Sequence, residues 1–238
     1  MGQLTGRVAV VTGGASGMGA AHSRILAEHG ATVAVCDINV TQGEALANEI
    51  GGAFYELDVC DERQWSRVLE EIVARHGPVT ILVNNAGKAL VAAVQDTSTE
   101  DWNRILAINV TGPFFGIRAV TPQMRATGGG VIVNVSSTAA LRGMAQQAAY
   151  ATSKWAVRGL TKAAAMDLAA DGIRVLSLHP ALIRTPMSEH LDLSAATAGY
   201  PIPRVGEADE VARMLLFMVA DATFSTGSEF VADGGSVL

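Results

Sequence analysis

Short apolar runs alternate with longer amphipathic stretches along the whole chain. The apolar runs lie at residues 8–11, 32–36, 53–57, 81–83, 131–135, 175–178 and 229–231. Several of them are continuous and rich in Val and Ile, which is typical of strands buried on both faces of a sheet. Stretches with helical periodicity lie near residues 18–29, 41–50, 61–76, 99–126, 150–170 and 207–220.

This alternation of strands and helices predicts a parallel sheet with helices on both faces. No linker, internal repeat or low-complexity segment interrupts the pattern, and the three glycines at 128–130 are interpreted as a helix stop rather than a domain boundary. The sequence therefore predicts one doubly wound α/β domain over residues 1–238, built on seven parallel strands.

Composition excludes several classes of protein. The net charge is -6 and the basic residues are scattered, so we expect no nucleic-acid partner. No apolar stretch approaches the roughly 18 residues of a membrane span, and the first apolar run is too short for a signal peptide. Two cysteines, Cys36 and Cys60, form no disulfide framework, which favours a cytoplasmic location. The histidines have no metal-ligand spacing, so we expect no metal.

Two of the predicted helices are apolar nearly all round, over residues 105–120 and 155–168. A helix of that kind is buried on most of its circumference. The sheet can cover one side, so we expect a second subunit to cover the other, although thicker packing within one chain would also account for the pattern.

A glycine-rich turn joins the first strand to the first helix at residues 12–19. Its glycines at 13, 17 and 19 have no Cβ and tolerate unusual dihedrals, so the backbone can approach a phosphate group closely. A strand, a glycine turn and a helix N-terminus together make a pyrophosphate site in a Rossmann-type fold. The predicted cofactor contacts in this turn are Gly13, Ser16, Gly17, Met18 and Gly19.

Asp37 ends the second strand, roughly 20 residues past the turn, where an acidic side chain can accept hydrogen bonds from an adenosine ribose. A 2′-phosphate at this point would be repelled by the carboxylate, and Ile38, Asn39 and Val40 supply no cation. We therefore expect NAD(H) rather than NADP(H). The alternative interpretation is an ordinary turn residue after a strand.

Polar and small residues also follow the third and fourth strands. Asp58 and Val59 could meet the amino group and the ring of an adenine, although an Asp at a strand end is common. Asn85, Ala86 and Gly87 suit a backbone that runs close to a ligand, or else a plain turn. His179, beside Pro180 after the sixth strand, is expected to be packed rather than catalytic.

Tyr150 and Lys154 are four residues apart and therefore share one face of a helix. A phenol with a pKa near 10 is a poor base at neutral pH, and a nearby ammonium favours the phenolate and lowers that pKa. Ser137, at the end of the fifth strand, could hydrogen-bond a substrate oxygen that gains alkoxide character. The three residues, with the glycine turn, predict an oxidoreductase.

The ordered set of these motifs resembles the classical short-chain dehydrogenase/reductase family over essentially the whole chain. Within that family the stretch 150–166 and the ending 231–235 are most similar to bacterial 3α(20β)-hydroxysteroid dehydrogenases and related secondary-alcohol dehydrogenases. The resemblance implies a homotetramer and contacts from Ile183 (by its backbone) and Thr185 to the cofactor carboxamide. It also implies a catalytic tetrad of Asn109, Ser137, Tyr150 and Lys154, in which Asn109 anchors a water that leads to Lys154.

We therefore expect an NAD-dependent dehydrogenase of a secondary alcohol with an apolar cyclic, aryl or steroid-like skeleton. A lid at about 186–203 would close the site, and the substrate residues expected around it are Ser137, Leu141, Met144, Gln147, Met187, Leu191, Leu193 and Tyr200. Two alternatives stay open. One is an enzyme resembling a 3-oxoacyl-carrier-protein reductase, and the other is a non-catalytic NAD-binding sensor or scaffold.

Overall fold

The computed structural model describes residues 2–238 as a single α/β domain around one parallel sheet of seven strands. The strands lie in the order β3-β2-β1-β4-β5-β6-β9. Their bounds are β1 (Val8–Thr12), β2 (Thr32–Asp37), β3 (Ala53–Glu56), β4 (Val79–Asn84), β5 (Gly130–Val135), β6 (Ile173–Pro180) and β9 (Glu229–Ala232). The order reverses between β1 and β4, which creates a crevice at the carboxyl ends of the strands. The predicted fold class is confirmed.

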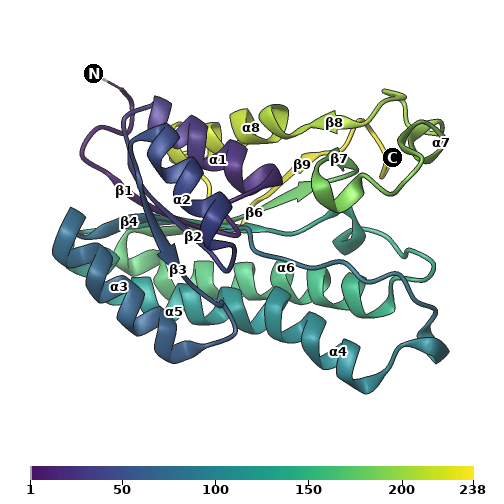
Figure 1. Cartoon of the computed structure of the whole chain (residues 1–238), viewed down its shortest axis with the longest axis horizontal. Helices are drawn as coiled ribbons and strands as arrows, with labels where there is room; N and C mark the ends of the chain where they lie inside the picture. The colour runs from purple at the N-terminus through teal and green to yellow at the C-terminus, as the bar shows by residue number, and fades with distance from the viewer. Residues whose placement is uncertain (1) are drawn as a thin grey trace.

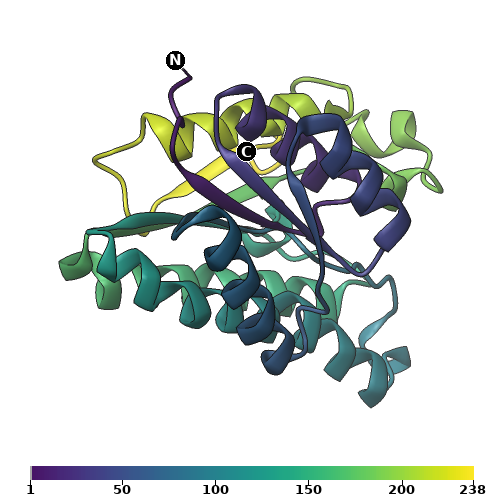
Figure 2. The ribbon, with the colours of Figure 1, turned by 60° about the vertical axis from the view of Figure 1, so that its left-hand side comes forward.

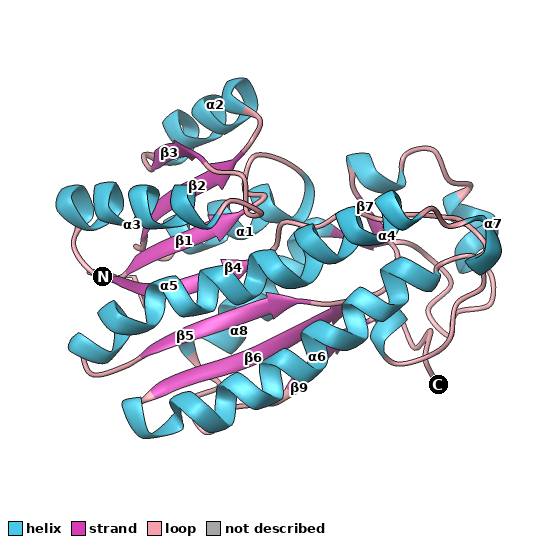
Figure 3. Ribbon diagram, turned by 90° about the horizontal axis from the view of Figure 1, so that it is seen from below, coloured by secondary structure: helices cyan, strands magenta, loops and turns pink. Residues whose placement is uncertain are grey.

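Helices cover both faces of this sheet, as Figures 1 and 2 show. One layer holds α1 (Gly17–Glu28), α2 (Val40–Ile50) and α8 (Ala208–Ala220), and the other holds α3 (Glu62–His76) and α6 (Ala148–Leu168) with the helices described next. In Figure 3 the second layer lies in front of the sheet, and its helices run roughly along the strands. The side chains of β1 alternate between the layers, because Val8 and Val10 join one buried cluster while Ala9 and Val11 join the other.

The single helix predicted over residues 99–126 is three segments in the structure. These are α4 (Thr99–Leu106), a π-helical turn η2 (Ala107–Thr111) and α5 (Gly112–Ala126). Pro113 has no N–H, so it cannot donate to the carbonyl of Asn109 four residues earlier, as an α-helix would require. The amide of Gly112 instead donates to Ala107, five residues back. Such π-helical turns occur frequently at functional sites.

A second, two-stranded parallel sheet was not predicted. It pairs β7 (Ile183–Arg184) with β8 (Gly206–Glu207), and the short helix α7 (Leu193–Thr197) lies between them in sequence. The two strands flank the predicted lid, α7 lies within it, and all three lie at one end of the molecule, near the C-terminus (Figure 1). Elements of two to five residues are too short for hydrophobic periodicity to reveal.

No helix of the described residues is long and apolar enough to cross a membrane.

Candidate active site

A cleft of about 410 Å³ opens at the carboxyl ends of the central strands, where the strand order reverses. Its volume lies within the roughly 300–1,000 Å³ of small-molecule and cofactor sites. The predicted cofactor and catalytic residues that line it are Gly13, Ser16, Gly17, Met18, Gly19, Asp37, Asp58, Val59, Asn85, Ala86, Gly87, Tyr150, Lys154 and Thr185. The predicted substrate residue Met187 lines it as well. Segments far apart in sequence therefore meet at one site, as the motif analysis predicts.

The glycine turn packs so tightly that at least two of its positions, Gly13 and Gly19, leave no room for a Cβ. Gly13 has a φ of +60°, and a Cβ placed there would lie 2.8 Å from the Cα of Ala86. The turn after β1 and the turn after β4 thus touch through their backbones, and a side chain at position 13 would force them apart.

The N-terminus of α1 keeps its first backbone amides available to a ligand. Ser16 is its N-cap residue, but the Ser16 side chain accepts no hydrogen bond from those amides. The N-caps of α2, α3 and α4 differ, since Asn39, Asp61 and Ser98 each accept from a first-turn amide of their helix. An uncapped helix N-terminus beside a glycine turn binds anions well, so the residues present fit a dinucleotide pyrophosphate.

Asn85, directly after β4, holds the glycine turn in place through hydrogen bonds. Its Nδ2 donates to the carbonyls of Thr12 and Gly13, both at 3.0 Å. In return the Thr12 hydroxyl accepts from the backbone amides of Asn85 and Ala86, both at 3.1 Å. The Asn85 side chain thus preorganises the turn, and its predicted contact with the cofactor stays a prediction.

Asp37 stands at the end of β2, on the wall of the cleft. One carboxylate oxygen accepts from the amide of Ala15 and the other from the amide of Asn39, both at 3.0 Å. Within residues 2–238, no Lys or Arg forms an ion pair with this carboxylate. The negative charge is therefore held in place without a compensating cation.

Lys154 is buried in α6, with only 5% of its surface exposed. Its Nζ donates to the carbonyl of Val135 at 3.0 Å and lies 5.6 Å from the centre of the Tyr150 ring. A Cβ at Gly87 would lie 3.5 Å from the same nitrogen, so the turn after β4 also approaches the amine. Burial lowers the pKa of Lys154 to about 8, because the charged form loses its hydration.

The pKa of the Tyr150 phenol is raised above its ordinary value of 10, and burial is the main cause. A side-chain hydrogen bond with Ser137 lowers this pKa and offsets part of the effect. The direction differs from the expectation that Lys154 lowers the pKa of the phenol. The physical reason is that burial deprives the phenolate of its hydration, and this loss outweighs the effect of the Ser137 hydrogen bond.

Ser137 lies beside Ser136, a residue of the cleft wall that sequence reasoning did not single out. Its Oγ accepts a hydrogen bond from the amide of Ala139 at 3.1 Å. A hydroxyl that accepts in this way still carries its own proton, so Ser137 keeps a donor for Tyr150 or for a substrate oxygen.

Asn109 is buried in the π-helical turn and does not touch Lys154 directly. Its Nδ2 donates to the Lys88 carbonyl at 3.0 Å and to the Ser153 hydroxyl at 2.9 Å, while its Oδ1 accepts from the Lys88 amide at 2.9 Å. Both N–H groups of the Asn109 side chain are therefore already hydrogen-bonded. The backbone carbonyl, to which Pro113 cannot donate, is suited to hold a water.

Other predicted residues lie elsewhere. Ile183 and Tyr200 line a second cavity, of about 210 Å³, beside β8 and α8. In the described part of the chain, Leu141, Met144, Gln147, Leu191 and Leu193 line neither cavity, and Leu191 is exposed. The substrate roles of this group stay predictions.

Several cleft residues were missed by sequence reasoning: Ile38, Leu57, Lys88, Arg104, Ile108, Val135, Ser136 and Pro186. A signal existed for some of them. Arg104 and Ile108 are four residues apart in the helix that leads to Asn109, so they share its face. Lys88 directly follows the Asn85–Gly87 motif, and its backbone is bonded to Asn109.

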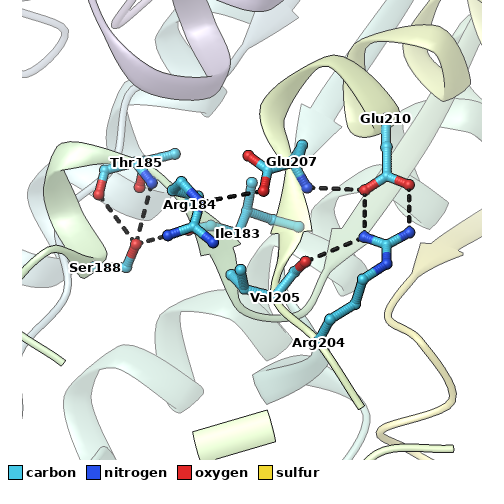
Figure 4. Close-up of polar contacts among 8 residues, drawn as sticks. All are labelled: Ile183, Arg184, Thr185, Ser188, Arg204, Val205, Glu207 and Glu210. Atoms are coloured by element: carbon cyan, nitrogen blue, oxygen red, sulfur yellow. Dashed lines mark hydrogen bonds and ion pairs between the residues drawn. The ribbon is translucent and has the colours of Figure 1, made fainter. Parts of the chain in front are cut away.

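Ion pairs hold the two ends of the predicted lid, residues 186–203 (Figure 4). Arg184 and Glu207, paired residues of β7 and β8, lie 3.1 Å apart. Arg204 binds both carboxylate oxygens of Glu210, at 2.7 and 2.8 Å. All four side chains are solvent-exposed, so these ion pairs contribute little to the free energy of unfolding. They connect Arg184, before the lid, and Arg204, directly after it, to β8 and α8.

Ser188 closes the first turn of the lid (Figure 4). Its hydroxyl donates to the Ile183 carbonyl at 2.7 Å and accepts from the Thr185 amide at 3.1 Å. Thr185, on the cleft wall, is thereby held at a defined position. No group of three or more His, Cys, Asp or Glu side chains within residues 2–238 could hold a metal ion.

Comparison with known proteins agrees with this geometry. A family model described as short chain dehydrogenase matches residues 7–195. A 3-alpha-(or 20-beta)-hydroxysteroid dehydrogenase of Mycobacterium tuberculosis is 42% identical, over 99% of this chain and 91% of the relative. A cyclopentanol dehydrogenase of Comamonas testosteroni is 45% identical, over 99% and 98%. An NADP-dependent (R)-specific alcohol dehydrogenase of Lentilactobacillus kefiri is 37% identical, over 98% and 97%.

Proposed function

The chain belongs to the short-chain dehydrogenase family, and from this we propose that it interconverts a secondary alcohol and its ketone with NAD(H). The observation that carries the proposal is the meeting of two motifs in one cleft. The glycine turn with its uncapped helix N-terminus supports binding of a dinucleotide, and Tyr150 with Lys154 supports proton transfer beside it.

When bound, the nicotinamide supplies hydride exchange at the substrate carbon. Tyr150 exchanges the proton at the substrate oxygen, accepting it from an alcohol or donating it to a ketone. Ser137 donates a hydrogen bond to the same oxygen and stabilises the charge that develops there. The charged form of Lys154 favours the Tyr150 phenolate, and its Nζ holds the nicotinamide ribose. The backbone carbonyl of Asn109 anchors a water that leads toward Lys154.

We assign the remaining predicted cofactor contacts by their place in the cleft, except that of Ile183, which lines the second cavity and is assigned from the family resemblance alone. Residues of the glycine turn hold the pyrophosphate, and Asp37 accepts from the adenosine ribose. Asp58 and Val59 meet the adenine, and Thr185 with the Ile183 backbone contacts the carboxamide. The preference for NAD(H) rests on the unpaired carboxylate of Asp37. Family membership alone does not decide it, because one relative is named as NADP-dependent.

The substrate is proposed to be an apolar alcohol or ketone with a cyclic, aryl or steroid-like skeleton. Met187 lines the cleft, and Leu191 and Ile202 are exposed apolar residues of the lid. Apolar walls with few polar groups favour a bulky hydrocarbon skeleton. Two relatives are named for a hydroxysteroid and for cyclopentanol, which supports the same class.

The test is kcat/KM, followed by the absorbance of NADH, on a hydroxysteroid, a cyclohexanol, an aryl-alkyl carbinol and a short 3-hydroxyacyl thioester. At least one apolar alcohol should exceed the thioester. A thioester that exceeds all three would replace this proposal with an acyl-reductase function. No turnover of any compound, combined with tight NADH binding, would favour a non-catalytic sensor.

We also propose that the chain works as a homo-oligomer, with the tetramer expected from its family. Phe114 on α5 is 42% exposed, and Trp155 and Met166 on α6 are 46% and 82% exposed. An apolar side that the sheet leaves uncovered suits a second copy of the chain. Cys36 and Cys60 are both unpaired, which is consistent with a reducing compartment such as the cytoplasm.

A further inference from the structure

His179 is completely buried near the end of β6, beside the turn that carries Ser137. Its Nδ1 lies 3.1 Å from the Ser137 carbonyl oxygen, and its Nε2 lies 2.8 Å from the Ser177 hydroxyl. A carbonyl oxygen can only accept, so Nδ1 carries the proton. In the neutral ring Nε2 then accepts from Ser177, which locks the tautomer.

The surroundings of His179 keep its ring neutral at pH 7. Burial lowers the pKa of His179, and the charges of Arg158 and Lys154 on α6 lower it further. Hydrogen bonding to the Ser137 carbonyl and the charge of Glu229 on β9 act in the opposite direction. The imidazole therefore serves as a fixed neutral donor and exchanges no proton with the cleft.

Residues 136–140 leave the sheet, so the direction of the Ser137 side chain depends on local ties. The Ser137 carbonyl accepts from the amide of Ala140 at 3.0 Å as well as from His179. The Ser137 Oγ accepts from the amide of Ala139 at 3.1 Å. Rotation of the Ser137 peptide plane would break these bonds together, and His179 is the member that reaches across from β6.

We propose that His179 is a positioning residue that holds Ser137 in the orientation needed to hydrogen-bond the substrate oxygen. The inference rests on the proposed function, because it assigns Ser137 that role. Ser177 completes the arrangement by fixing the tautomer of the imidazole. His179 does not line the cleft, so it acts through Ser137.

A matched pair of substitutions separates this role from simple packing. His179→Asn keeps a donor nitrogen at the δ position, and His179→Gln places it at the ε position, away from the Ser137 carbonyl. We expect His179→Gln to lower kcat/KM for the ketone by about 10²-fold, the effect of a misplaced catalytic group. His179→Asn should recover most of that loss, and Ser177→Ala should show a smaller loss. The Kd of NADH should stay unchanged in all three.

A purely structural role would lower Tm equally in both His179 variants without separating their kcat/KM. Full kcat/KM in folded His179→Gln, or unfolding of all three variants, would overturn the proposal. Failure of the proposed function would instead appear as inactivity of the unmodified protein.

A second readout needs no turnover. The Ser137 hydrogen bond lowers the pKa of Tyr150, so His179→Gln should raise the Tyr150 titration midpoint. This midpoint is measured by phenolate absorbance as the difference from Tyr150→Phe. An unchanged midpoint in His179→Gln would contradict the inference.

Discussion

Lys154 holds its amine nitrogen 5.6 Å from the centre of the Tyr150 ring, one helical turn further along α6. The same nitrogen donates to Val135 at the end of β5, so helix and sheet together fix its position. Burial disfavours the charged form of both side chains. It therefore raises the pKa of Tyr150 and lowers the pKa of Lys154. A protein with such an active site is often less stable than a variant in which the buried functional group is replaced.

Removal of the phenol should stop the reaction without loosening the cofactor. Tyr150→Phe is expected to lower kcat by about 10²–10⁴-fold, because general acid–base catalysis is lost. The Kd of NADH, measured by fluorescence, should change little, since the glycine turn is untouched. Tyr55→Phe is the control: this phenol pairs with His76 at 3.1 Å and does not line the cleft. Near-normal kcat in Tyr150→Phe would refute the proposed mechanism.

Removal of the buried amine should stabilise the protein while it destroys activity. Lys154→Met is expected to raise the free energy of unfolding at pH 7 by about 1–3 kcal/mol, because the unfolded amine keeps its ordinary pKa of about 10.4. Activity and ribose binding should both fall. The two measurements are Tm by calorimetry and kcat/KM. Lys162→Met, at an exposed position of the same helix, is the control, and a Tm of Lys154→Met at or below that of the unmodified protein would contradict this expectation.

Cofactor choice should depend on one carboxylate. We expect kcat/KM with NADH to exceed that with NADPH by at least about tenfold, or about 1.4 kcal/mol. Asp37→Ala should narrow the ratio by removing the charge that repels a 2′-phosphate. Glu56→Ala is the matched control. Glu56 lies next to Asp37 in the register of β2 and β3, but it does not line the cleft. Equal turnover with both cofactors in the unmodified protein would exclude the assignment.

The burial of His22 predicts that the protein becomes less stable toward unfolding at acidic pH. The ring is completely buried in α1, neither of its nitrogens has a hydrogen-bond partner among the described residues, and burial lowers its pKa to about 3. In the unfolded chain its pKa is about 6.5, so the unfolded state binds more protons between pH 6.5 and 3. Stability is therefore lost as pH falls through this range, by about 2 kcal/mol at pH 5 relative to pH 8.

His22→Leu should remove this contribution. Urea unfolding at pH 8 and pH 5 measures it, with exposed His190→Leu as the control. If His22→Leu and the unmodified protein lose equal stability between the two pH values, the buried histidine does not titrate as the structure implies.

The sequence by itself determined the architecture and most of the cleft wall. Short, continuous Val and Ile runs are typical of strands covered on both faces, so their alternation with helices predicts the parallel sheet from local pattern. Strand carboxyl ends in such a sheet share one edge, which is why Gly13, Asp37 and Asn85 could be assigned to one site from the sequence.

Only the tertiary structure decided what each side chain binds. The His179–Ser137 and Asn109–Ser153 contacts join residues more than 40 positions apart, and no periodicity records such pairs. The structure also decided that Tyr200 lines the second cavity, that a π-helical turn divides the predicted helix, and that a two-stranded sheet holds the lid. The physical reason is that periodicity reports which face of an element is buried, whereas partners and pKa values depend on close packing between elements.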